Sequence, residues 1–556
     1  MSRRSRVFAA LAAILAGLLP LAAFPPFGGA DLTAYLQTID RPTNALPLPG
    51  DATICWIAWV PLILLVRRVA PRRAFLLGWL AGTVHWLFSL HWLLALAHNG
   101  GPFTLVLLGE VALSVYLGLY WGLFAQADAF LHGLARDRPL PTTAAHLAEP
   151  FLWIGCDWLR SWLLTGFPWN LPAVALSPAH PLAQTAALGG AIAVSWPILT
   201  ANGLVATLLD RFGHTLFRRP LPRSVLQTLV PLVVLLALQF YGLNYLRSVN
   251  RLYAQAPTTR IAYCQTNAAC NPQRQTAELA DRFEHLLQQV HHVSVLHPDL
   301  VLWPESALFY ALPQTYPTSL ATRAVTIAKA PILTGCALVE GQSFYNSAAL
   351  FRPGDTTYAA IRHKRHLVPF GEYIPLDKAI PWLQRLVPTG ASCSPGYDST
   401  PIDIPLKERP PLRLAPLICY EDIYSTLARD AARHQANILV NLSNDNWFDG
   451  SCELRLHLAQ SAYRAVETGL PLLRVCNGGV SAVVTPAGRA TPCTSDGTRL
   501  EGFAASGVWT VPYLQTPPRT FYSRFGNWIC AIPSAILLLV TLLCSLRHPL
   551  PPPEGE

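Results

Sequence analysis

The stretch LAPLICYEDIY, residues 414–424, changes character at one residue. An apolar run leads to Cys419, and polar residues follow at once. A short apolar run of this kind is typical of a buried strand, and in α/β folds functional groups gather where such strands end. A lone cysteine there is more often a core residue, because free cysteine is among the most buried residue types. The segment therefore predicts a strand that ends at Cys419. Whether the thiol has a chemical role depends on which other functional residues the sequence supplies.

Similar apolar runs recur on both sides of this segment, and helical patterns separate several of them. The expected strands are RIAYCQTN, DLVLWPES, APILTGCAL, ANILVNLSND and LPLLRVCNGG, all within 260–479. The expected helices include TAELADRFEHLLQQVHHV (276–293) and ELRLHLAQSAYRAVETG (453–469). This alternation predicts an α/β domain with layered sheets and helices outside them.

The composition predicts that the rest of the chain lies in a membrane. Of the 556 residues, 52% are hydrophobic and only 13% are charged, whereas a soluble domain carries about 25% charged residues. About eight apolar segments approach the length of a transmembrane helix. They are 7–24, 53–66, 74–96, 103–126, 147–165, 185–209, 225–246 and 528–546. We therefore expect a transmembrane domain of seven helices at 1–246, a soluble domain at 247–527, and a final transmembrane helix with a cytoplasmic tail at 528–556.

The arginines predict how these helices are oriented. They concentrate in the N-terminal MSRRSR, in RRVAPRR (67–73), and in the loops after the fourth and sixth segments, while the alternate loops carry only Arg41. The positive-inside rule then places both termini in the cytoplasm and the 247–527 domain on the periplasmic side. The net charge of +9 is explained by topology, and no nucleic-acid partner is expected. The first segment could also be a cleaved signal peptide, but an uncleaved helix preserves the alternation of charge.

The chain has twelve cysteines, eight of them between 264 and 493. An exported domain lies in an oxidising compartment, so some of the eight could pair, and the spacing does not fix which. Neither a CxxC pair nor a Cys/His ligand spacing occurs among them. We therefore expect no metal site.

Three motifs each supply one chemically useful group. LWPES supplies Glu305, HKRHLVPFGEY supplies Lys364 and Glu372, and LICYED supplies Cys419. A cysteine nucleophile needs a base, which a carboxylate can provide, and a lysine with the backbone N–H of Tyr420 can stabilise an oxyanion. Taken singly, Glu305 could cap a helix and Lys364 could belong to a solvated charged run. The combination is far more specific than any one of its members.

This order of glutamate, lysine and cysteine resembles the nitrilase superfamily, whose fold is a four-layer αββα sandwich. The chain is also similar to the apolipoprotein N-acyltransferase family over nearly all of 1–547. The membrane motif WLRSWLLTGFPW (158–169) carries this similarity, together with WPES, KRHLVPFGEYIPL, ICYED, LSNDNWF, RAVETGLPLLRVCNGG and YSRFGNW in order. One departure is that a tryptophan usual in the family shortly after the first outer strand is absent from QTNAACNPQRQ (265–275).

The resemblance implies a role for each matching residue. The base would be Glu305, the catalytic lysine Lys364 and the nucleophile Cys419, and the supporting active-site residues would be Glu372, Tyr420 and Glu421. The implied reaction is N-acylation of the diacylglyceryl-cysteine of apolipoproteins through a cysteine thioester, the final step of bacterial lipoprotein maturation. A membrane phospholipid would donate the acyl chain, and a monomer in the bacterial inner membrane would catalyse the transfer without a cofactor.

Two other functions fit parts of the pattern. A membrane-tethered amidase of the nitrilase type would use water as the acceptor, and a water-excluding cavity would disfavour it. A catalytically inactive scaffold could present lipoproteins to a partner, although the complete Glu–Lys–Cys set argues against it. Phospholipid supplied with a lipopeptide amine distinguishes the three, because they yield N-acylated peptide, free fatty acid, or neither.

Overall fold

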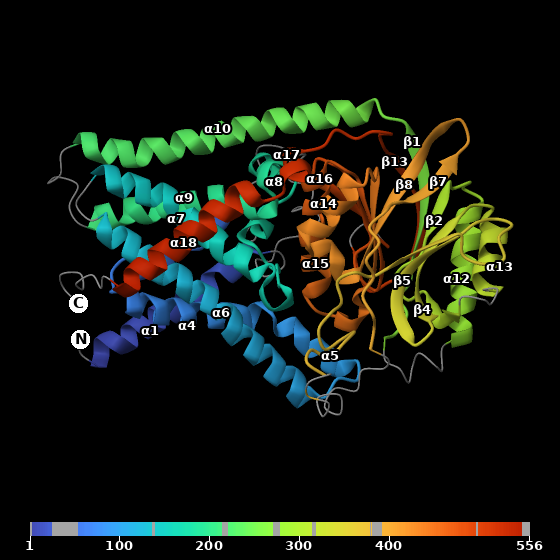
Figure 1. The fold of residues 1–556 in the computed structure, drawn as a ribbon, viewed down its shortest axis with the longest axis horizontal. Coiled ribbons are helices and arrows are strands. Elements are labelled where there is room, and N and C mark those ends of the chain that lie inside the picture. The colour runs from blue at the N-terminus through green and yellow to red at the C-terminus, as the bar shows by residue number, and fades with distance from the viewer. Residues whose placement is uncertain are drawn as a thin grey trace. The chain divides into compact units, whose positions relative to one another are not determined.

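The computed structural model describes residues 3–24, 54–135, 139–213, 221–270, 279–313, 319–377, 380, 392–495 and 499–547. The chain divides into two compact units. The helical unit is Met1–Ser248 with Thr520–Glu556, and the sandwich unit is Val249–Arg519 (Figure 1).

The helical unit contains helices of very different lengths, joined by short 3₁₀ turns. They are α1 (Arg3–Leu18), α3 (Val60–Val66), α4 (Pro71–Ser89), α5 (Ala95–His98), α6 (Phe103–Leu134), α7 (Pro139–Arg160), α8 (Ala186–Gly189), α9 (Ala191–Gly213), α10 (Leu221–Ala254), α17 (Phe521–Phe525) and α18 (Trp528–Arg547). Among the described residues, four helical segments are long and apolar enough to cross a membrane: Phe103–Leu134, Ala191–Asp210, Leu229–Ala254 and Trp528–Arg547. The pair Pro71–Ser89 and His91–His98, bent by 44°, would make a fifth.

These five segments overlap the predicted spans 103–126, 185–209, 225–246, 528–546 and 74–96. The other three predicted spans are not confirmed. Val7–Ala23 and Ile54–Val66 are apolar helical segments of less than spanning length. The span predicted at 147–165 lies mostly on α7, which ends at Arg160. Its charged side chains Glu149, Asp157 and Arg160 lower its mean hydropathy.

Side chains in the helical unit are arranged as a lipid environment requires. Large apolar side chains remain exposed on the long helices, such as Leu108 (61%), Phe240 (68%) and Leu539 (58%). Several charged side chains are largely buried and paired instead: Arg67 binds Glu149, and Arg160 Nη2 lies 2.8 Å from Asp157 Oδ1. Buried, paired charges and an apolar exterior are what membrane-embedded helices show, so this unit fits a membrane protein.

The sandwich unit contains two sheets. The first has the order β13-β1-β2-β4-β5-β6, with β3 also beside β4, and the second has the order β12-β11-β10-β9-β8-β7. The strands of the first sheet are β1 (Thr258–Gln265), β2 (Leu300–Leu302), β3 (Leu308–Pro313), β4 (Ile332–Glu340), β5 (Ser343–Phe351), β6 (Ala360–His363) and β13 (Ala505–Pro512). Those of the second are β7 (Ile402–Leu406), β8 (Arg409–Ile418), β9 (Ile438–Asn444), β10 (Leu472–Asn477), β11 (Ala482–Val484) and β12 (Ala490–Pro492).

Two apolar layers hold the sandwich unit together. One lies between the sheets and includes Leu302 from the first sheet and Ile418 and Val440 from the second. The other joins the first sheet to helices α12 (Leu279–Ser294) and α13 (Ser319–Ala328). Helices α14 (Ser425–Arg433), α15 (Glu453–Ser461) and α16 (Tyr463–Thr468) cover the second sheet (Figure 1). The layers are therefore helix, sheet, sheet and helix, which is the predicted αββα sandwich.

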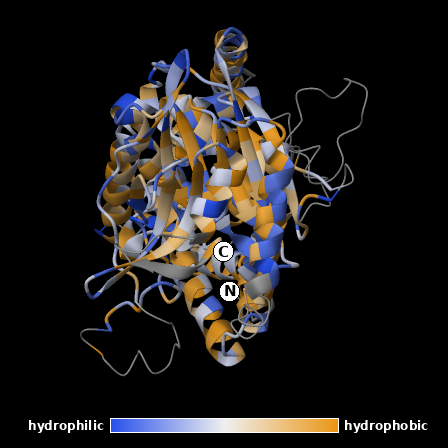
Figure 2. Ribbon diagram, turned by 90° about the vertical axis from the view of Figure 1, so that its right-hand side faces the viewer, coloured by the Kyte–Doolittle hydropathy of each residue, from blue (hydrophilic) through white to orange (hydrophobic). Residues whose placement is uncertain are grey.

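Strand direction brings the predicted site residues to one region of the sandwich. β8, β9 and β10 run parallel to one another, as do β1, β2 and β4. Hydrophobic and hydrophilic residues are interspersed along both the helices and the strands in Figure 2. Glu305 comes shortly after β2 in the first sheet, and Cys419 comes directly after β8 in the second. Both therefore lie at ends of parallel strands, where α/β folds carry their sites.

Candidate active site

Cys419 occupies a tight turn directly after β8. It begins the short 3₁₀ helix Cys419–Ile423, and its φ angle is +53°. A positive φ is sterically costly for any residue other than glycine, and it persists where surrounding contacts impose it. One such contact comes from Asn441 on β9, whose Nδ2 donates to the carbonyl oxygens of Cys419 at 2.9 Å and Leu417 at 3.1 Å.

Glu305 lies against the thiol and is buried, with 7% of its surface exposed. Burial raises the pKa of its carboxyl above the ordinary value, and the hydrogen bond with the Cys419 side chain acts in the opposite direction. Its Oε1 accepts a hydrogen bond from Asn346 Nδ2 at 2.7 Å. The backbone at this point is closely packed, because a Cβ on Gly335 would lie 2.4 Å from the Glu305 Cα. A carboxylate with a raised pKa is well suited to accept the thiol proton.

Lys364 supplies a buried positive charge beside this carboxylate. Its Nζ lies 2.9 Å from Glu372 Oε1 and 3.7 Å from Glu305 Oε1. Burial opposes the charge, but Glu372, Cys419 and Glu305 outweigh it and raise the pKa of the ammonium group above its ordinary value. The lysine is therefore protonated across the physiological pH range, as a group that stabilises an oxyanion must be.

Burial also raises the pKa of the Cys419 thiol, to about 12, with Glu305 adding to the shift and Lys364 opposing it. The thiol is therefore neutral at pH 7. Its proton has to leave during attack, and the carboxylate that can take it is Glu305.

Glu372 and Glu421 hold the segment that carries Lys364. Glu372 Oε2 accepts from the Val368 N–H at 2.8 Å, while its Oε1 contacts the lysine. Glu421 Oε1 accepts from the N–H groups of Arg365 at 2.6 Å and His366 at 3.0 Å, and its Oε2 accepts from Ile418 N–H at 2.7 Å. Glu421 therefore joins the lysine segment to the end of β8.

Tyr420 contributes an aromatic contact next to the thiol. Its ring packs edge-on against Tyr424 with the centroids 5.3 Å apart, and the Tyr424 ring lies 3.9 Å from that of His366. The structure thus brings all six predicted site residues into one region. Residues 271–275 of the stretch that lacks the family's usual tryptophan lie outside the described residues.

The sequence analysis missed Asn346. Its Nδ2 lies 2.7 Å from both Glu305 Oε1 and Glu372 Oε1, so one amide bridges the two carboxylates. No motif marks it in the strand SFYNSAALF. An amide side chain in the middle of a strand that otherwise holds small, apolar and aromatic residues was the available signal.

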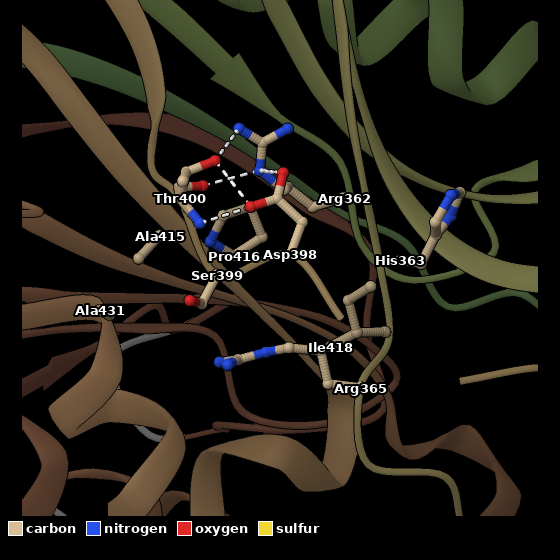
Figure 3. Close-up of a pocket in the computed structure, with 10 residues that line it drawn as sticks. All are labelled: Arg362, His363, Arg365, Asp398, Ser399, Thr400, Ala415, Pro416, Ile418 and Ala431. Atoms are coloured by element: carbon tan, nitrogen blue, oxygen red, sulfur yellow. Dashed lines mark hydrogen bonds and ion pairs between the residues drawn. The ribbon is translucent and has the colours of Figure 1, made fainter. Parts of the chain in front are cut away.

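A shallow pocket lies beside this region but is not centred on it. Its lining is Arg362, His363, Arg365, Asp398, Ser399, Thr400, Ala415, Pro416, Ile418 and Ala431 (Figure 3). Figure 3 shows Arg362 bonded to Thr400 and Asp398 on one side of it. These three residues pair with one another through hydrogen bonds and an ion pair. The residues Glu305, Lys364 and Cys419 do not line the pocket. We therefore base the chemistry on the buried group around Cys419.

Comparison with known proteins agrees with this geometry. Residues 260–500 match the family model described as carbon-nitrogen hydrolase, which defines the class of the sandwich unit. Residues 43–204 match the model described as apolipoprotein N-acyltransferase N-terminal domain. The apolipoprotein N-acyltransferase of Azotobacter vinelandii is 32% identical over 90% of this chain and 93% of the relative. That of Geobacter metallireducens is 30% identical over 89% of this chain and 92% of the relative.

The chain therefore belongs to the apolipoprotein N-acyltransferase family. Among solved structures, an amidase from Neterenkonia sp. AN1 is similar at 21% identity, with 48% of this chain and 96% of the amidase covered. The TM-score of this comparison is 0.34.

Proposed function

We propose that this enzyme transfers an acyl chain from a membrane phospholipid to the N-terminal diacylglyceryl-cysteine of an apolipoprotein, with Cys419 as nucleophile. The observation that carries the proposal is the buried group formed by Glu305, Lys364 and Cys419, in which the carboxylate contacts both the thiol and the ammonium. Family membership supports the reaction, and the geometry supports the assignment of residues.

The first half-reaction forms an acyl-enzyme. Glu305 takes the thiol proton as Cys419 Sγ attacks the acyl ester carbon. The oxyanion is stabilised by the Lys364 ammonium, with the backbone N–H of Tyr420 as a second donor. The C–O bond then breaks, Glu305 gives its proton to the departing lysophospholipid oxygen, and the acyl chain remains on sulfur as a thioester.

The second half-reaction transfers the chain to nitrogen. The free α-amine of the diacylglyceryl-cysteine attacks the thioester carbon, an N–C bond forms, and the S–C bond breaks. Glu305 takes the amine proton and returns a proton to the Cys419 thiolate, so the enzyme ends in its starting state. Because an amide is more stable than a thioester, the step needs no energy source and no cofactor.

The supporting residues have positioning roles in this scheme. Glu372 orients the ammonium of Lys364, and Glu421 ties the lysine segment to the nucleophile turn. Tyr420 packs beside the thiol through its aromatic contacts.

The membrane arrangement forms part of the proposal. Both substrates are anchored in the bilayer, which accounts for a catalytic domain fused to apolar helices. We place eight spans within 1–246 and 528–556, with the 247–527 domain on the periplasmic side of the inner membrane, acting as a monomer. The arginine pattern supports this orientation.

One assay separates this function from hydrolysis. Purified enzyme is given acyl-labelled phospholipid and a diacylglyceryl-peptide with a free amine, and the products are identified by mass spectrometry. The proposal predicts N-acylated peptide that requires both substrates. Free fatty acid as the main product would instead establish a membrane-bound amidase or esterase, and absence of both products would favour a scaffold.

A further inference from the structure

A fully buried group of charged residues lies on the helix-covered face of the second sheet, separate from Glu305 and Lys364. Three residues stand in register on adjacent parallel strands: Leu417 on β8, Asn441 on β9 and Arg474 on β10. Leu473 and Val475, on either side of Arg474, face the apolar layer between the sheets. Because side chains alternate along a strand, Arg474 points away from that layer, toward the helices.

The Arg474 guanidinium connects three acceptors. Its Nη1 donates to Asn441 Oδ1 at 2.8 Å and to Asp422 Oδ2 at 2.6 Å, and its Nη2 donates to Asp445 Oδ2 at 2.5 Å. Asn441 in turn donates to the carbonyl oxygen of Cys419. A continuous path of hydrogen bonds therefore leads from Arg474 to the backbone of the strained turn.

His457 on α15 completes the group from the helix side. Its Nε2 lies 2.8 Å from Asp422 Oδ1, and its Nδ1 lies 3.2 Å from both Asp445 Oδ1 and Glu453 Oε1. A carboxylate can only accept hydrogen bonds, so both ring nitrogens carry protons and the ring is an imidazolium. The pKa of His457 is raised well above its ordinary value by Asp422 and Asp445, which outweigh burial and Arg474. Two cations thus face two aspartates and Glu453, whose pKa burial raises to about 7.

The ligand atoms of Asp445, Glu453 and His457 lie within 4.8 Å of one another, a spacing that a metal ion could use. Arg474 and the His457 imidazolium already supply the positive charge there, within hydrogen-bond distance of Asp445. Both aspartates of the group are therefore already paired with these cations, and a further link leads through Asn441 to Cys419.

We propose that Arg474 and His457 are positioning residues for the nucleophile. Through Asn441, Arg474 fixes the carbonyl of Cys419. Through Asp422, both residues fix the turn three residues further on, so that the turn keeps its positive φ and the thiol stays at Glu305. Neither residue touches the substrate or the reacting atoms. The inference rests on Cys419 as the nucleophile of the proposed function.

The test uses the full-length enzyme and the variant Arg474→Lys, which keeps the buried charge but cannot reach Asn441, Asp422 and Asp445 together. The matched control is Arg409→Lys. Arg409 also forms a two-pronged pair, with Nη1 and Nη2 at 3.0 and 2.5 Å from the two oxygens of Asp299. Each protein is tested by thermal unfolding and by single-turnover acyl loading from labelled phospholipid at several phospholipid concentrations. The rate at which iodoacetamide alkylates Cys419 is also measured between pH 6 and 10.

Arg474→Lys should slow loading about 10- to 100-fold with the half-saturating phospholipid concentration unchanged, because a misplaced nucleophile affects the chemical step. The dependence of its Cys419 alkylation rate on pH should also differ from that of the wild-type enzyme. Arg409→Lys should lower the melting temperature while loading per folded enzyme and the alkylation profile stay at wild-type values. If Arg474→Lys behaves like Arg409→Lys, the network is structural and the inference is wrong.

Asn441→Leu gives a second measurement should Arg474→Lys fail to fold. It cuts the link to the Cys419 carbonyl and leaves Asp422, Asp445, His457 and Arg474 paired. It should also slow loading and shift the alkylation profile, and wild-type behaviour would overturn the inference. Failure of the proposed function looks different: wild-type enzyme itself would carry no label on Cys419, whatever the variants do.

Discussion

Two groups of buried charges flank the Cys419 turn, and they are built differently. In the group containing Glu305 and Lys364, the ammonium lies 3.7 Å from the carboxylate that contacts the thiol, and the pKa of that carboxyl is raised. In the group containing Arg474, the contacts to Asp422 and Asp445 are 2.6 and 2.5 Å. In the first group the ammonium pairs closely with Glu372, at 2.9 Å, and leaves the Glu305 carboxylate free to exchange a proton, whereas the close pairs of Arg474 fix a position. We therefore propose chemistry for the first group and positioning for the second.

The largest effect should come from removing the base. Glu305→Gln keeps the size of the side chain and its bond from Asn346 but cannot accept the thiol proton. Acyl loading of Cys419 should fall by about 10²–10⁴-fold, the usual contribution of a general base. Single-turnover loading from labelled phospholipid measures this, with the exposed Glu284→Gln on α12 as control. Loading within about tenfold of the wild-type rate would show that Glu305 is not the general base.

Removing the cation should have the next largest effect. Lys364→Ala deletes the charge that faces the oxyanion, and the loss of one such group costs about 10²–10³-fold in rate. Lys329→Ala, at an exposed lysine of the same unit, should load normally. The same assay at saturating phospholipid checks both variants. A Lys364→Ala enzyme that loads as fast as Lys329→Ala would show that the oxyanion is stabilised elsewhere.

Glu372→Ala should have a smaller but clear effect, because Glu372 acts on the oxyanion through Lys364. We expect turnover to fall by about 10- to 100-fold, as for other misplaced catalytic groups, while the enzyme remains folded and inserted. Steady-state N-acylation and thermal unfolding measure the two properties separately. Wild-type turnover would mean that Glu372 is a partly exposed carboxylate without a role in catalysis.

The pH dependence should be the mildest effect. Glu305 works as a base only when ionised, and burial raises its pKa above the ordinary 4.5, so loading should fall as the pH falls, with a midpoint above that value. The pKa of Lys364 is raised above its ordinary 10.5, so the ammonium should cause no loss of rate on the alkaline side below that pH. Single-turnover rates from pH 4 to pH 10 test both limbs. If the loading rate fell to half its maximum only below pH 4.5, the raised pKa of Glu305 would be contradicted.

The sequence predicted what lies at strand ends and in ordered motifs. Cys419 and Glu305 were identifiable because an apolar run stops beside each of them, and the motif order supplied Lys364 between them. Asn346 and Arg474 were not identifiable, because each lies inside a mostly apolar strand, and its partners depend on strand register. Arg474 meets Asp422, 52 residues away, only after β8, β9 and β10 pair.

The predicted spans show a similar division. Long apolar segments such as 103–126 correspond to apolar helices of spanning length. The segment 147–165 contains charges that are paired only in the folded unit, where Arg160 meets Asp157. Hydropathy along the chain cannot register that pairing, and so cannot decide whether such a segment crosses the membrane.

The central claim is that Cys419 carries the acyl chain between donor and acceptor. Enzyme incubated with acyl-labelled phospholipid alone should take label on Cys419 that survives denaturation and is released by neutral hydroxylamine, as a thioester is. A diacylglyceryl-peptide with a free amine should then remove the label as an amide, while the N-acetylated peptide should not, because it lacks the attacking lone pair. Cys419→Ala should take no label. Label on another cysteine, or normal N-acylation by Cys419→Ala, would contradict the account.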